Sequence, residues 1–334
     1  MKEGQNMNTA LFPVQSSLLD PKVLLTALND RYDIKIKTCR LWSNSVNDVY
    51  TLCTEIGTLY LRISQAKRYS RIDFEEELHI IITLHKNGVS ACTPIAARNN
   101  EYIWEINAPE GTRYAVLFNE AKYTFSGERQ IQLYNLGVML ATLHTVADEQ
   151  QFKVSREPLL FYQLAAHPLE MLKEPLINRQ EDYVFLQTSS ETLWKFIKER
   201  LKEETPYYGY CHGDMHSGNV IFDGERPQIF DFDCMGYGYR AYDICIFIWN
   251  EIFGKEGYIA PDEWVKYIEG YSSIRKLSEH ELSCIPAFAA LRQLWLMGLH
   301  LDATSTNNNW SDFNNDYFNF QISKFKMWFD RVLF

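Results

Sequence analysis

The feature that most constrains the fold of this chain is a polar segment framed by apolar residues at positions 210–236, with the sequence YCHGDMHSGNVIFDGERPQIFDFDCMG. Seven Asp, His and Asn side chains occur between His212 and Asp233. Two apolar patches, Val220–Phe222 and Ile229–Phe232, interrupt them and predict short strands joined by a turn at DGERP. A surface loop would not be framed by buried strands, so we predict a catalytic loop here.

The rest of the chain divides into a strand-rich first third and a helical remainder. The first third begins with a predicted helix capped by Asp20 with Pro21 at its first position. Strands are predicted at 34–41, 48–54, 58–63, 101–106 and 113–118, with a helix at 73–88 between them. Apolar spacing of three and four predicts helices at 129–148, 181–201, 240–254, 261–271 and 286–302. The fold class is therefore α+β, with two lobes at 1–118 and 119–334 and a link near 118–124.

Composition excludes several classes of protein. The 334 residues carry a net charge of −10, which argues against nucleic-acid binding because such proteins present a basic patch. Seven scattered cysteines without a C-x-x-C pair are typical of reduced thiols, not of a disulfide framework or a zinc site. The N-terminus has no apolar signal core, and no run of about 18 apolar residues is present. We expect a cytoplasmic protein that does not enter a membrane.

Three residues of the opening segment have the side chains that phosphoryl transfer requires. Asp214 and Asn219 lie five positions apart on one loop, and the predicted hairpin carries Asp231 back toward that loop. Carboxylate and amide oxygens suit Mg²⁺, and a further carboxylate that does not bind the metal orients or deprotonates a hydroxyl nucleophile. A catalytic Asp, an Asn five residues later and a metal-binding Asp after a strand are the parts of a kinase-like site.

Each of these residues also has a structural interpretation. A single Asp or Asn in a turn usually caps a helix or forms the turn. The D-x-x-x-x-N spacing, the flanking glycines and Asp231 coincide here, which favours the functional interpretation. His212 fits a residue that braces the loop better than one that acts as a base. His216 fits a surface position and a substrate neighbour equally well.

The segment resembles the aminoglycoside phosphotransferase and choline kinase family. The family pattern is H-G-D-x-x-x-x-N, then I-D-[FW]-[DE], then Y-D, and the chain has HGDMHSGN, IFDFD and Tyr242–Asp243. The pattern H-x-G-N…D-F-D-x-x-G-Y-G-x-R-x-Y-D resembles stress-response kinases and type II homoserine kinases more than choline kinases. The resemblance covers nearly the whole chain. It implies a two-lobed protein-kinase-like fold that uses ATP and Mg²⁺ to phosphorylate hydroxyl groups.

The resemblance also implies roles for individual residues of the large lobe. Asp214 would be the catalytic base, with His212 beside it in the catalytic loop. Asn219 and Asp231 would bind the metal. Asp243 would brace the loop from the next helix, in the second shell of the site. Asp233 would assist the metal, its water or the substrate, or else be a solvated or capping residue.

In the small lobe the same resemblance implies an ATP-binding role for a polar turn and a cation. The turn between two strands lacks the glycine-rich sequence of protein kinases and would cover the phosphates through Ser43, Asn44, Ser45 and Asn47. Arg62 occupies the place of the usual family lysine; it keeps the charge but differs in reach and geometry.

The predicted partner of Arg62 is a glutamate of the helix at 73–88. Glu77 fits the family spacing best, with Glu75 and Glu76 as competitors. Phe118 and Glu120 would lie at the hinge that meets the adenine.

We predict an ATP- and Mg²⁺-dependent phosphotransferase whose acceptor is a small hydroxylated molecule such as an aminoglycoside, an amino alcohol or a homoserine-like metabolite. A cationic acceptor would suit the acidic chain. The alternatives are a Ser/Thr protein kinase of the stress-response type and a metal-dependent phosphohydrolase built on the His and Asp residues. The preference for ATP over GTP stays open, as does the choice between a monomer and a homodimer.

Other nucleotide-binding classes fit poorly. The chain has no G-x-x-x-x-G-K-[ST] motif, which excludes a P-loop enzyme. GYGYRA at 236–241 matches the glycine pattern of dinucleotide binding but lacks a surrounding βαβ unit. A catalytically inactive nucleotide-binding module is disfavoured because Asp214, Asn219 and Asp231 are all present.

Overall fold

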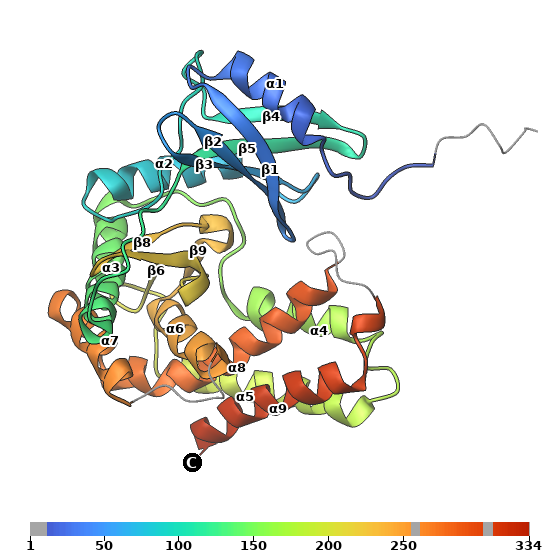
Figure 1. Ribbon diagram of the computed structural model, residues 1–334. Helices are drawn as coiled ribbons and strands as arrows, with labels where there is room; N and C mark the ends of the chain where they lie inside the picture. The colour runs from blue at the N-terminus through green and yellow to red at the C-terminus, as the bar shows by residue number, and fades with distance from the viewer. Residues whose placement is uncertain (1–11, 255–260, 303–309, 334) are drawn as a thin grey trace, which may run out of the picture.

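The computed structural model describes residues 12–254, 261–302 and 310–333 and has two lobes (Figure 1). In the small lobe, five antiparallel strands form one sheet in the order β1-β2-β3-β5-β4. The elements of this lobe are α1 (Pro21–Arg31), β1 (Ile36–Asn44), β2 (Asn47–Thr54), β3 (Thr58–Ser64), α2 (Arg71–Lys86), β4 (Ile103–Ala108) and β5 (Gly111–Asn119). The predicted fold class is confirmed, and the assignment of ATP binding to 1–118 stays a prediction.

The large lobe is mainly helical and contains two small two-stranded sheets, β6-β9 and β7-β8. Its long helices are α3 (Arg129–Gln150), α5 (Gln180–Lys198), α6 (Arg240–Gly254), α7 (Pro261–Ile274), α8 (Glu279–Leu301) and α9 (Asn315–Leu333). The shorter elements are η2 (Tyr162–Ala166), α4 (His167–Leu172), β6 (Tyr208–Cys211), η3 (Ser217–Asn219), β7 (Val220–Asp223), β8 (Arg226–Ile229), η4 (Phe232–Cys234), β9 (Gly236–Tyr239) and η5 (Trp310–Asp312).

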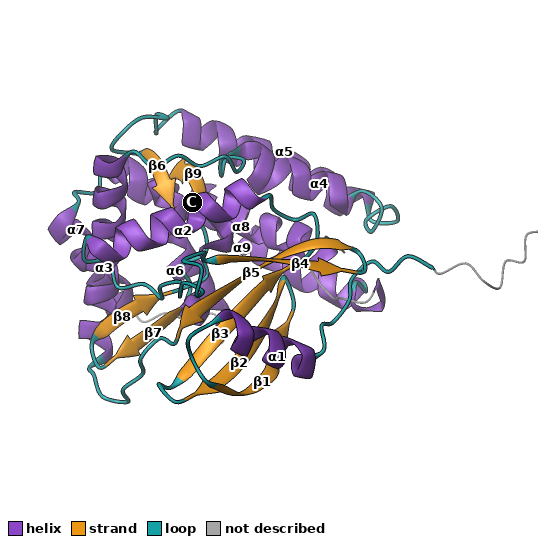
Figure 2. Cartoon of the chain, turned by 90° about the horizontal axis from the view of Figure 1, so that it is seen from above, coloured by secondary structure: helices purple, strands orange, loops and turns teal. Residues whose placement is uncertain are grey.

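The two helices of the small lobe belong to different hydrophobic cores. Helix α1 starts where its sequence predicts, because the Asp20 side chain accepts a hydrogen bond from the backbone N–H of Lys22. It packs across one face of the sheet, and Leu28 is part of that core (Figure 2). Helix α2 buries Phe74 and Leu78 in the core of the large lobe. The small lobe is therefore joined to the large lobe through α2.

The hairpin of the polar segment differs in register from its prediction. The second strand spans Arg226–Ile229 and includes Pro227, so the turn is confined to Gly224 and Glu225. The predicted strand at 229–232 is wrong beyond its first residue, because Asp231 lies after β8 in a left-handed conformation with φ +63°. Proline is tolerated because this two-stranded sheet consists of edge strands.

The glycine-rich GYGYRA segment forms a strand instead of a dinucleotide-binding loop. Residues 236–239 are β9, which pairs antiparallel with β6, and helix α6 follows directly. Since no parallel crossover surrounds it, the segment lacks the phosphate-binding turn of that fold. The interpretation as a dinucleotide site is therefore excluded.

Within the described residues, one helix, α8, has the length and composition that a membrane crossing requires. Most of its apolar window, 67%, is buried inside the protein. Its neighbours α4, α5, α6 and α9 pack around it. A helix that is apolar on most sides is typical of a protein core, so this is weak evidence for a membrane span.

Helices α3 and α7 approach each other closely through glycines. A Cβ atom on Gly137 of α3 would lie 2.1 Å from the backbone oxygen of Tyr267. On the facing helix, a Cβ atom on Gly270 would lie 1.9 Å from the oxygen of Tyr134. Both contacts are with backbone, so a side chain at either position would force the helices apart.

We expect Gly137→Ala to lower the free energy of unfolding by about 1–3 kcal/mol because of this overpacking. The sign of this change is informative, because a Gly→Ala substitution at a solvent-exposed helix position raises the free energy of unfolding by roughly 0.5–1 kcal/mol. Urea unfolding measures the difference, and Gln130→Ala on the exposed side of α3 is the control, with a change within about 0.5 kcal/mol. Stabilisation by Gly137→Ala would contradict the close approach of α3 and α7.

Candidate active site

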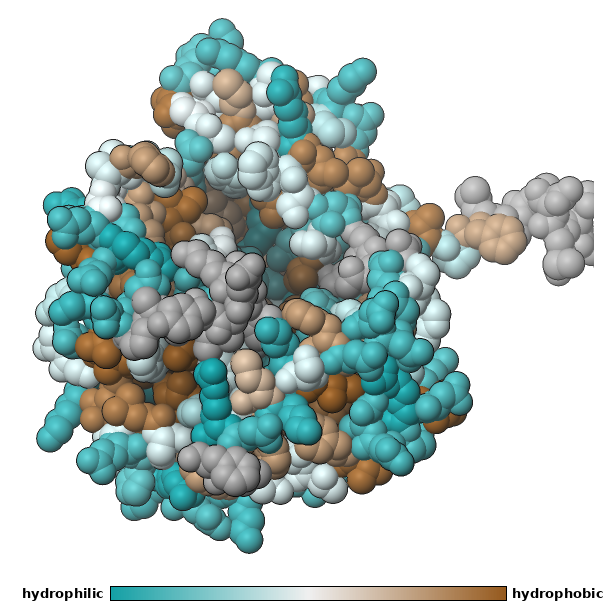
Figure 3. Space-filling model, turned by 60° about the horizontal axis from the view of Figure 1, so that its bottom comes forward, coloured by the Kyte–Doolittle hydropathy of each residue, from teal (hydrophilic) through white to brown (hydrophobic). Residues whose placement is uncertain are grey.

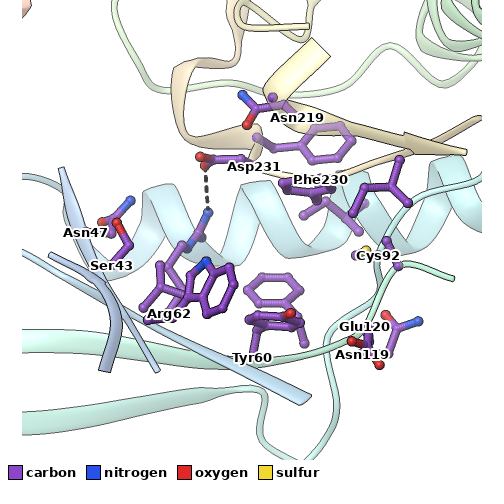
Figure 4. Close-up of a pocket in the computed structure, with 18 of the residues that line it drawn as sticks. Ser43, Asn47, Tyr60, Arg62, Cys92, Asn119, Glu120, Asn219, Phe230 and Asp231 are labelled. Atoms are coloured by element: carbon purple, nitrogen blue, oxygen red, sulfur yellow. Dashed lines mark ion pairs between the residues drawn. The ribbon is translucent and has the colours of Figure 1, made fainter. Parts of the chain in front are cut away.

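A cavity of 620 Å³ lies between the sheet of the small lobe and the β7–β8 hairpin of the large lobe. The space-filling view shows the molecule hollowed between the lobes (Figure 3), and Figure 4 shows the lining side chains. The predicted residues on its wall are Ser43, Ser45, Asn47, Arg62, Glu77, Phe118, Glu120, Asn219 and Asp231. Residues of the small lobe and the hinge thus face residues 219–231 of the large lobe across one space.

The loop that carries Asp214 is pressed against the turn that follows Asp231. Gly213 has φ +80°, and a Cβ atom there would lie 2.0 Å from the backbone oxygen of Cys234. A side chain would therefore be strained by the backbone and would also collide with it. Glycine at this position allows the two predicted halves of the site to pack together.

Asp243, at the start of α6, binds the backbone of the same loop. Its two carboxylate oxygens accept hydrogen bonds of 2.7 Å from the backbone N–H groups of His212 and Gly213. The ring of buried His144 lies 3.0 Å from the same carboxylate and 2.8 Å from the Tyr271 hydroxyl. Burial raises the pKa of Asp243 to about 6, although the two backbone donors oppose this shift. Through these contacts, Asp243 restrains the backbone of the loop that carries Asp214.

His144, Cys211 and Asp243 also place three potential metal-binding atoms within 4.8 Å of one another. Hydrogen bonds to protein groups already account for the histidine and the carboxylate. Burial holds the pKa of His144 well below its usual range and that of the Cys211 thiol well above. Both groups are therefore neutral parts of the packing beneath the loop.

His212 is fully buried, which fits a bracing residue. Its ring packs on Phe232 at 4.5 Å between centroids, and its Nε2 lies 3.3 Å from the backbone oxygen of Phe230. Its Nδ1 accepts a hydrogen bond of 3.3 Å from the backbone N–H of Asp214. Burial lowers the pKa of His212 to about 4, so the ring is neutral at pH 7.

Asp214 has different partners on its two carboxylate oxygens. Oδ1 forms an ion pair with Arg292 of α8. Oδ2 accepts a hydrogen bond of 3.2 Å from the Asn219 amide and lies 3.6 Å from Nε2 of His216. Burial alone would raise the pKa of Asp214, but Arg292 and His216 outweigh it and hold the pKa below its usual value. The carboxylate is ionised at neutral pH and is able to accept a proton.

Arg292 is a residue of this site that the sequence did not indicate. Its guanidinium lies 3.9 Å from the Trp295 ring and 5.1 Å from the Trp249 ring, and it donates to the Tyr242 hydroxyl at 3.2 Å. Both tryptophan rings thus pack against a cation of the chain itself. An arginine in an apolar helix carries no local signal, because its partner is 78 residues away.

Asp231 lies on the cavity wall opposite Arg62, as the dashed line of Figure 4 shows. The Arg62 Nη1 and Asp231 Oδ1 atoms are 3.8 Å apart. Desolvation in the cleft and the negative charge of Asp233 raise the pKa of Asp231 to about 7, although 41% of its side chain is exposed. A carboxylate in this environment gains from a further cation.

Asp233 has one satisfied and one unsatisfied oxygen. Its Oδ2 lies 3.3 Å from Nη2 of Arg68, and its buried Oδ1 has no hydrogen-bond partner among the described residues. The amide nitrogen of Asn219 faces Asp214, which leaves the amide oxygen for another partner. Oxygens from Asn219, Asp231 and Asp233 are the hard donors that Mg²⁺ prefers. The residues present thus fit a magnesium ion.

In the small lobe, Arg62 pairs with Glu77 at 2.6 Å, and the Glu77 side chain is fully buried. The competing glutamates have other partners, since Glu75 pairs with Arg71 at 2.9 Å and Glu76 accepts hydrogen bonds from Ser155. The ring of Phe118 lies 5.3 Å from the guanidinium. Among the three candidates, the structure therefore places Glu77 beside Arg62.

The β1–β2 turn lies over the mouth of the cavity. Ser43, Ser45 and Asn47 line it, whereas the Asn44 side chain donates to Asp48 at 3.1 Å and lies outside the lining. At the hinge, Phe118 and Glu120 also line the cavity.

Comparison with known proteins supports one family. The model of the phosphotransferase enzyme family (APH) matches residues 37–277. A Synechocystis protein, sll1119, is 33% identical over 313 residues, which cover 92% of this chain and 85% of that protein. A homoserine kinase of Rhizobium meliloti is 25% identical over 245 residues and covers 73% of this chain and 72% of its own.

Two solved structures share the fold at low sequence identity. An amicoumacin kinase in complex with AMP-PNP, Ca²⁺ and Ami superposes with a TM-score of 0.74 at 20% identity and covers 94% of both chains. A microcompartment-associated aminopropanol kinase superposes with a TM-score of 0.72 at 18% identity, covering 93% of this chain and 97% of that one. The kinase-like two-lobed architecture expected from the sequence is confirmed.

The buried neutral imidazole of His212 makes stability depend on pH. Between pH 6.5 and about pH 4 the unfolded chain takes up a proton that the folded protein refuses, so the free energy of unfolding falls as the pH drops. Between pH 7 and pH 5 we expect the free energy of unfolding of the wild type to fall by about 2 kcal/mol more than that of the His212→Gln variant. Urea unfolding of both proteins at the two pH values measures this; equal losses would contradict a buried neutral ring.

Proposed function

This chain belongs to the phosphotransferase enzyme family (APH), and on that premise we propose that it transfers the γ-phosphate of ATP to a hydroxyl group of a small molecule. The observation that carries the proposal is the arrangement around the cavity. Asp214 is ionised and lies beside Asn219. Asp231 faces Arg62 across the same space. Acid, amide and cation are thus grouped as phosphoryl transfer requires.

The cavity offers separate surroundings for the two ends of a nucleotide. Apolar and aromatic side chains of the lining, including Tyr60, Phe118 and Ile221, suit a base. The polar β1–β2 turn and Arg62 suit phosphates, because a guanidinium binds phosphate oxygens in pairs. The ion pair with Glu77 fixes the position of the Arg62 guanidinium.

A magnesium ion would be held by Asn219 and Asp231, with Asp233 beside them, and would supply positive charge to the phosphate oxygens. It would also relieve the crowding that raises the pKa of Asp231. The cation site stays a proposal that rests on the donor set and on the unpartnered Asp233 oxygen.

In the proposed step, Asp214 orients the acceptor hydroxyl and accepts its proton. As the acceptor oxygen forms a bond to the γ-phosphorus, the bond from that phosphorus to the β-phosphate oxygen breaks, and ADP leaves. The proton moves to the carboxylate, where Oδ2 is the oxygen free of the Arg292 pair. His212 and Asp243 take no proton in this step and hold the loop.

The named relatives support a small acceptor. They are named as kinases of homoserine, amicoumacin and aminopropanol, which are all small molecules. The homoserine kinase relationship agrees with the pattern of the catalytic segment. A cytoplasmic location and a monomeric or homodimeric state stay predictions from the sequence.

An ADP-release screen tests the proposal. Purified protein with Mg²⁺ and ATP should release ADP when given one class among aminoglycosides, amino alcohols, homoserine-like hydroxy amino acids and sugars. Phosphorylation of a generic protein substrate would instead support the protein-kinase alternative. Metal-dependent hydrolysis of phosphoesters without ATP, together with no ADP release, would refute the proposal.

Replacement of Asp214 separates chemistry from binding. Asp214→Asn keeps the shape and the Arg292 contact but cannot accept the proton, so we expect kcat to fall by about 10²–10⁴-fold. The rise in melting temperature given by Mg²⁺ and ATP should persist. Asp182→Asn, which removes a carboxylate on distant α5, is the matched control and should leave kcat unchanged. Full activity of Asp214→Asn would exclude Asp214 as the base.

A further inference from the structure

Two consecutive residues after α3, Ser155 and Arg156, bind two consecutive glutamates of α2. The backbone N–H and hydroxyl of Ser155 donate to the Glu76 carboxylate at 2.7 and 2.8 Å. The Arg156 guanidinium donates to Oε2 of Glu77 at 2.8 Å. Helix α2 is thereby fastened to the large lobe at the turn that contains Glu77.

Arg156 also binds the turn that follows Asp231. Its Nη1 atom donates to the backbone oxygens of Phe232 and Asp233 at 3.1 and 2.8 Å. The guanidinium lies 4.1 Å from the centre of the Tyr69 ring, and the Tyr69 hydroxyl donates to the same Asp233 oxygen at 2.8 Å. The Arg156 side chain is 7% exposed, so these contacts are made away from water.

We propose that Arg156 is a positioning residue that couples the nucleotide-binding pair Arg62–Glu77 to the metal-binding turn at Asp231. The inference rests on the proposed function and deepens it. One guanidinium contacts Glu77 on one side and the two carbonyls directly after Asp231 on the other. Any displacement of one half of the site is therefore transmitted to the other half.

The geometry of Asp231 explains why such a restraint matters. A non-glycine residue at φ +63° is strained and persists when neighbouring groups fix the backbone around it. Arg156 and Tyr69 supply three hydrogen bonds to the two following residues. Without them, the carboxylate of Asp231 would lose its fixed orientation toward the cavity.

The two ends of the contact should respond differently to loss of Arg156. Glu77 keeps its 2.6 Å ion pair with Arg62, so the phosphate-binding cation stays in place. The backbone carbonyls of residues 232 and 233 lose their charged donor, since Arg156 supplies the bonds to both, and the bond from Arg68 goes to the Asp233 side chain. The inference therefore predicts a selective loss of the metal-dependent part of ATP binding.

The test compares Arg156→Met with the wild type by titration with ATP in the presence of Mg²⁺ and again in EDTA. The affinity in EDTA should stay within about twofold, while the gain in affinity from Mg²⁺ should shrink by about tenfold, as expected for lost hydrogen bonds to a charged donor. Hydrogen exchange of the ligand-free protein gives a second readout, with faster exchange at residues 231–235.

Two milder variants and one control accompany this test. Arg156→Lys keeps the charge but not the forked donors and should show an intermediate loss. Tyr69→Phe removes one hydrogen-bond donor to the backbone oxygen of Asp233 and keeps the aromatic ring. This variant replaces Arg156→Met in the test if Arg156→Met does not fold. Arg179→Met removes a guanidinium from the far side of the large lobe and should leave both affinities unchanged.

The outcomes separate this inference from the function on which it rests. An unchanged gain from Mg²⁺ in the Arg156 and Tyr69 variants would overturn the coupling and leave the kinase proposal intact. Equal weakening with and without Mg²⁺ would also overturn it, because that is the effect of general destabilisation. No ATP binding by the wild type would overturn the proposed function and the inference together.

Discussion

The buried carboxylate of Glu77 is the group on which the rest of the site depends. A fully buried charge is tolerated when it is paired and hydrogen-bonded, and here Arg62 and Arg156 contact its two oxygens separately. Arg62 comes from the small lobe and Arg156 from the large lobe, so one carboxylate holds both sides of the cleft. Helix α2, which carries it, packs into the core of the large lobe and against the sheet above.

The catalytic segment depends on a second buried carboxylate in the same way. Asp243 accepts hydrogen bonds from two consecutive backbone N–H groups, those of His212 and Gly213. It thereby fixes the part of the loop that lies directly before Asp214. The loop then packs against the turn after Asp231, where a glycine allows backbone to touch backbone. The groups proposed to bind the metal and to accept the proton thus take their positions from buried carboxylates.

Sequence patterns identified the main parts of this architecture because those parts are local. Strand alternation, helical spacing and the Asp20 cap each involve neighbouring residues, and most of the predicted helices and strands appear close to their expected ranges. Helix α8 begins at Glu279 instead of at residue 286, and α4 and α9 were not predicted. The D-x-x-x-x-N spacing likewise lies within one loop. An error occurred where pairing overrides local preference: β8 includes Pro227, and the predicted strand at 229–232 is wrong beyond Ile229.

The sequence by itself determined the fold class and the family, and it predicted the group formed by Asp214, Asn219 and Asp231, because these features follow from short local motifs. The tertiary structure decided which glutamate pairs with Arg62, and it brought Arg156 and Arg292 into the site. Both arginines come from segments whose local pattern is ordinary, and their acidic partners, Glu77 and Asp214, lie 79 and 78 residues away. Ion pairs over such separations form only when folding brings the segments together, so no local pattern in the sequence records them.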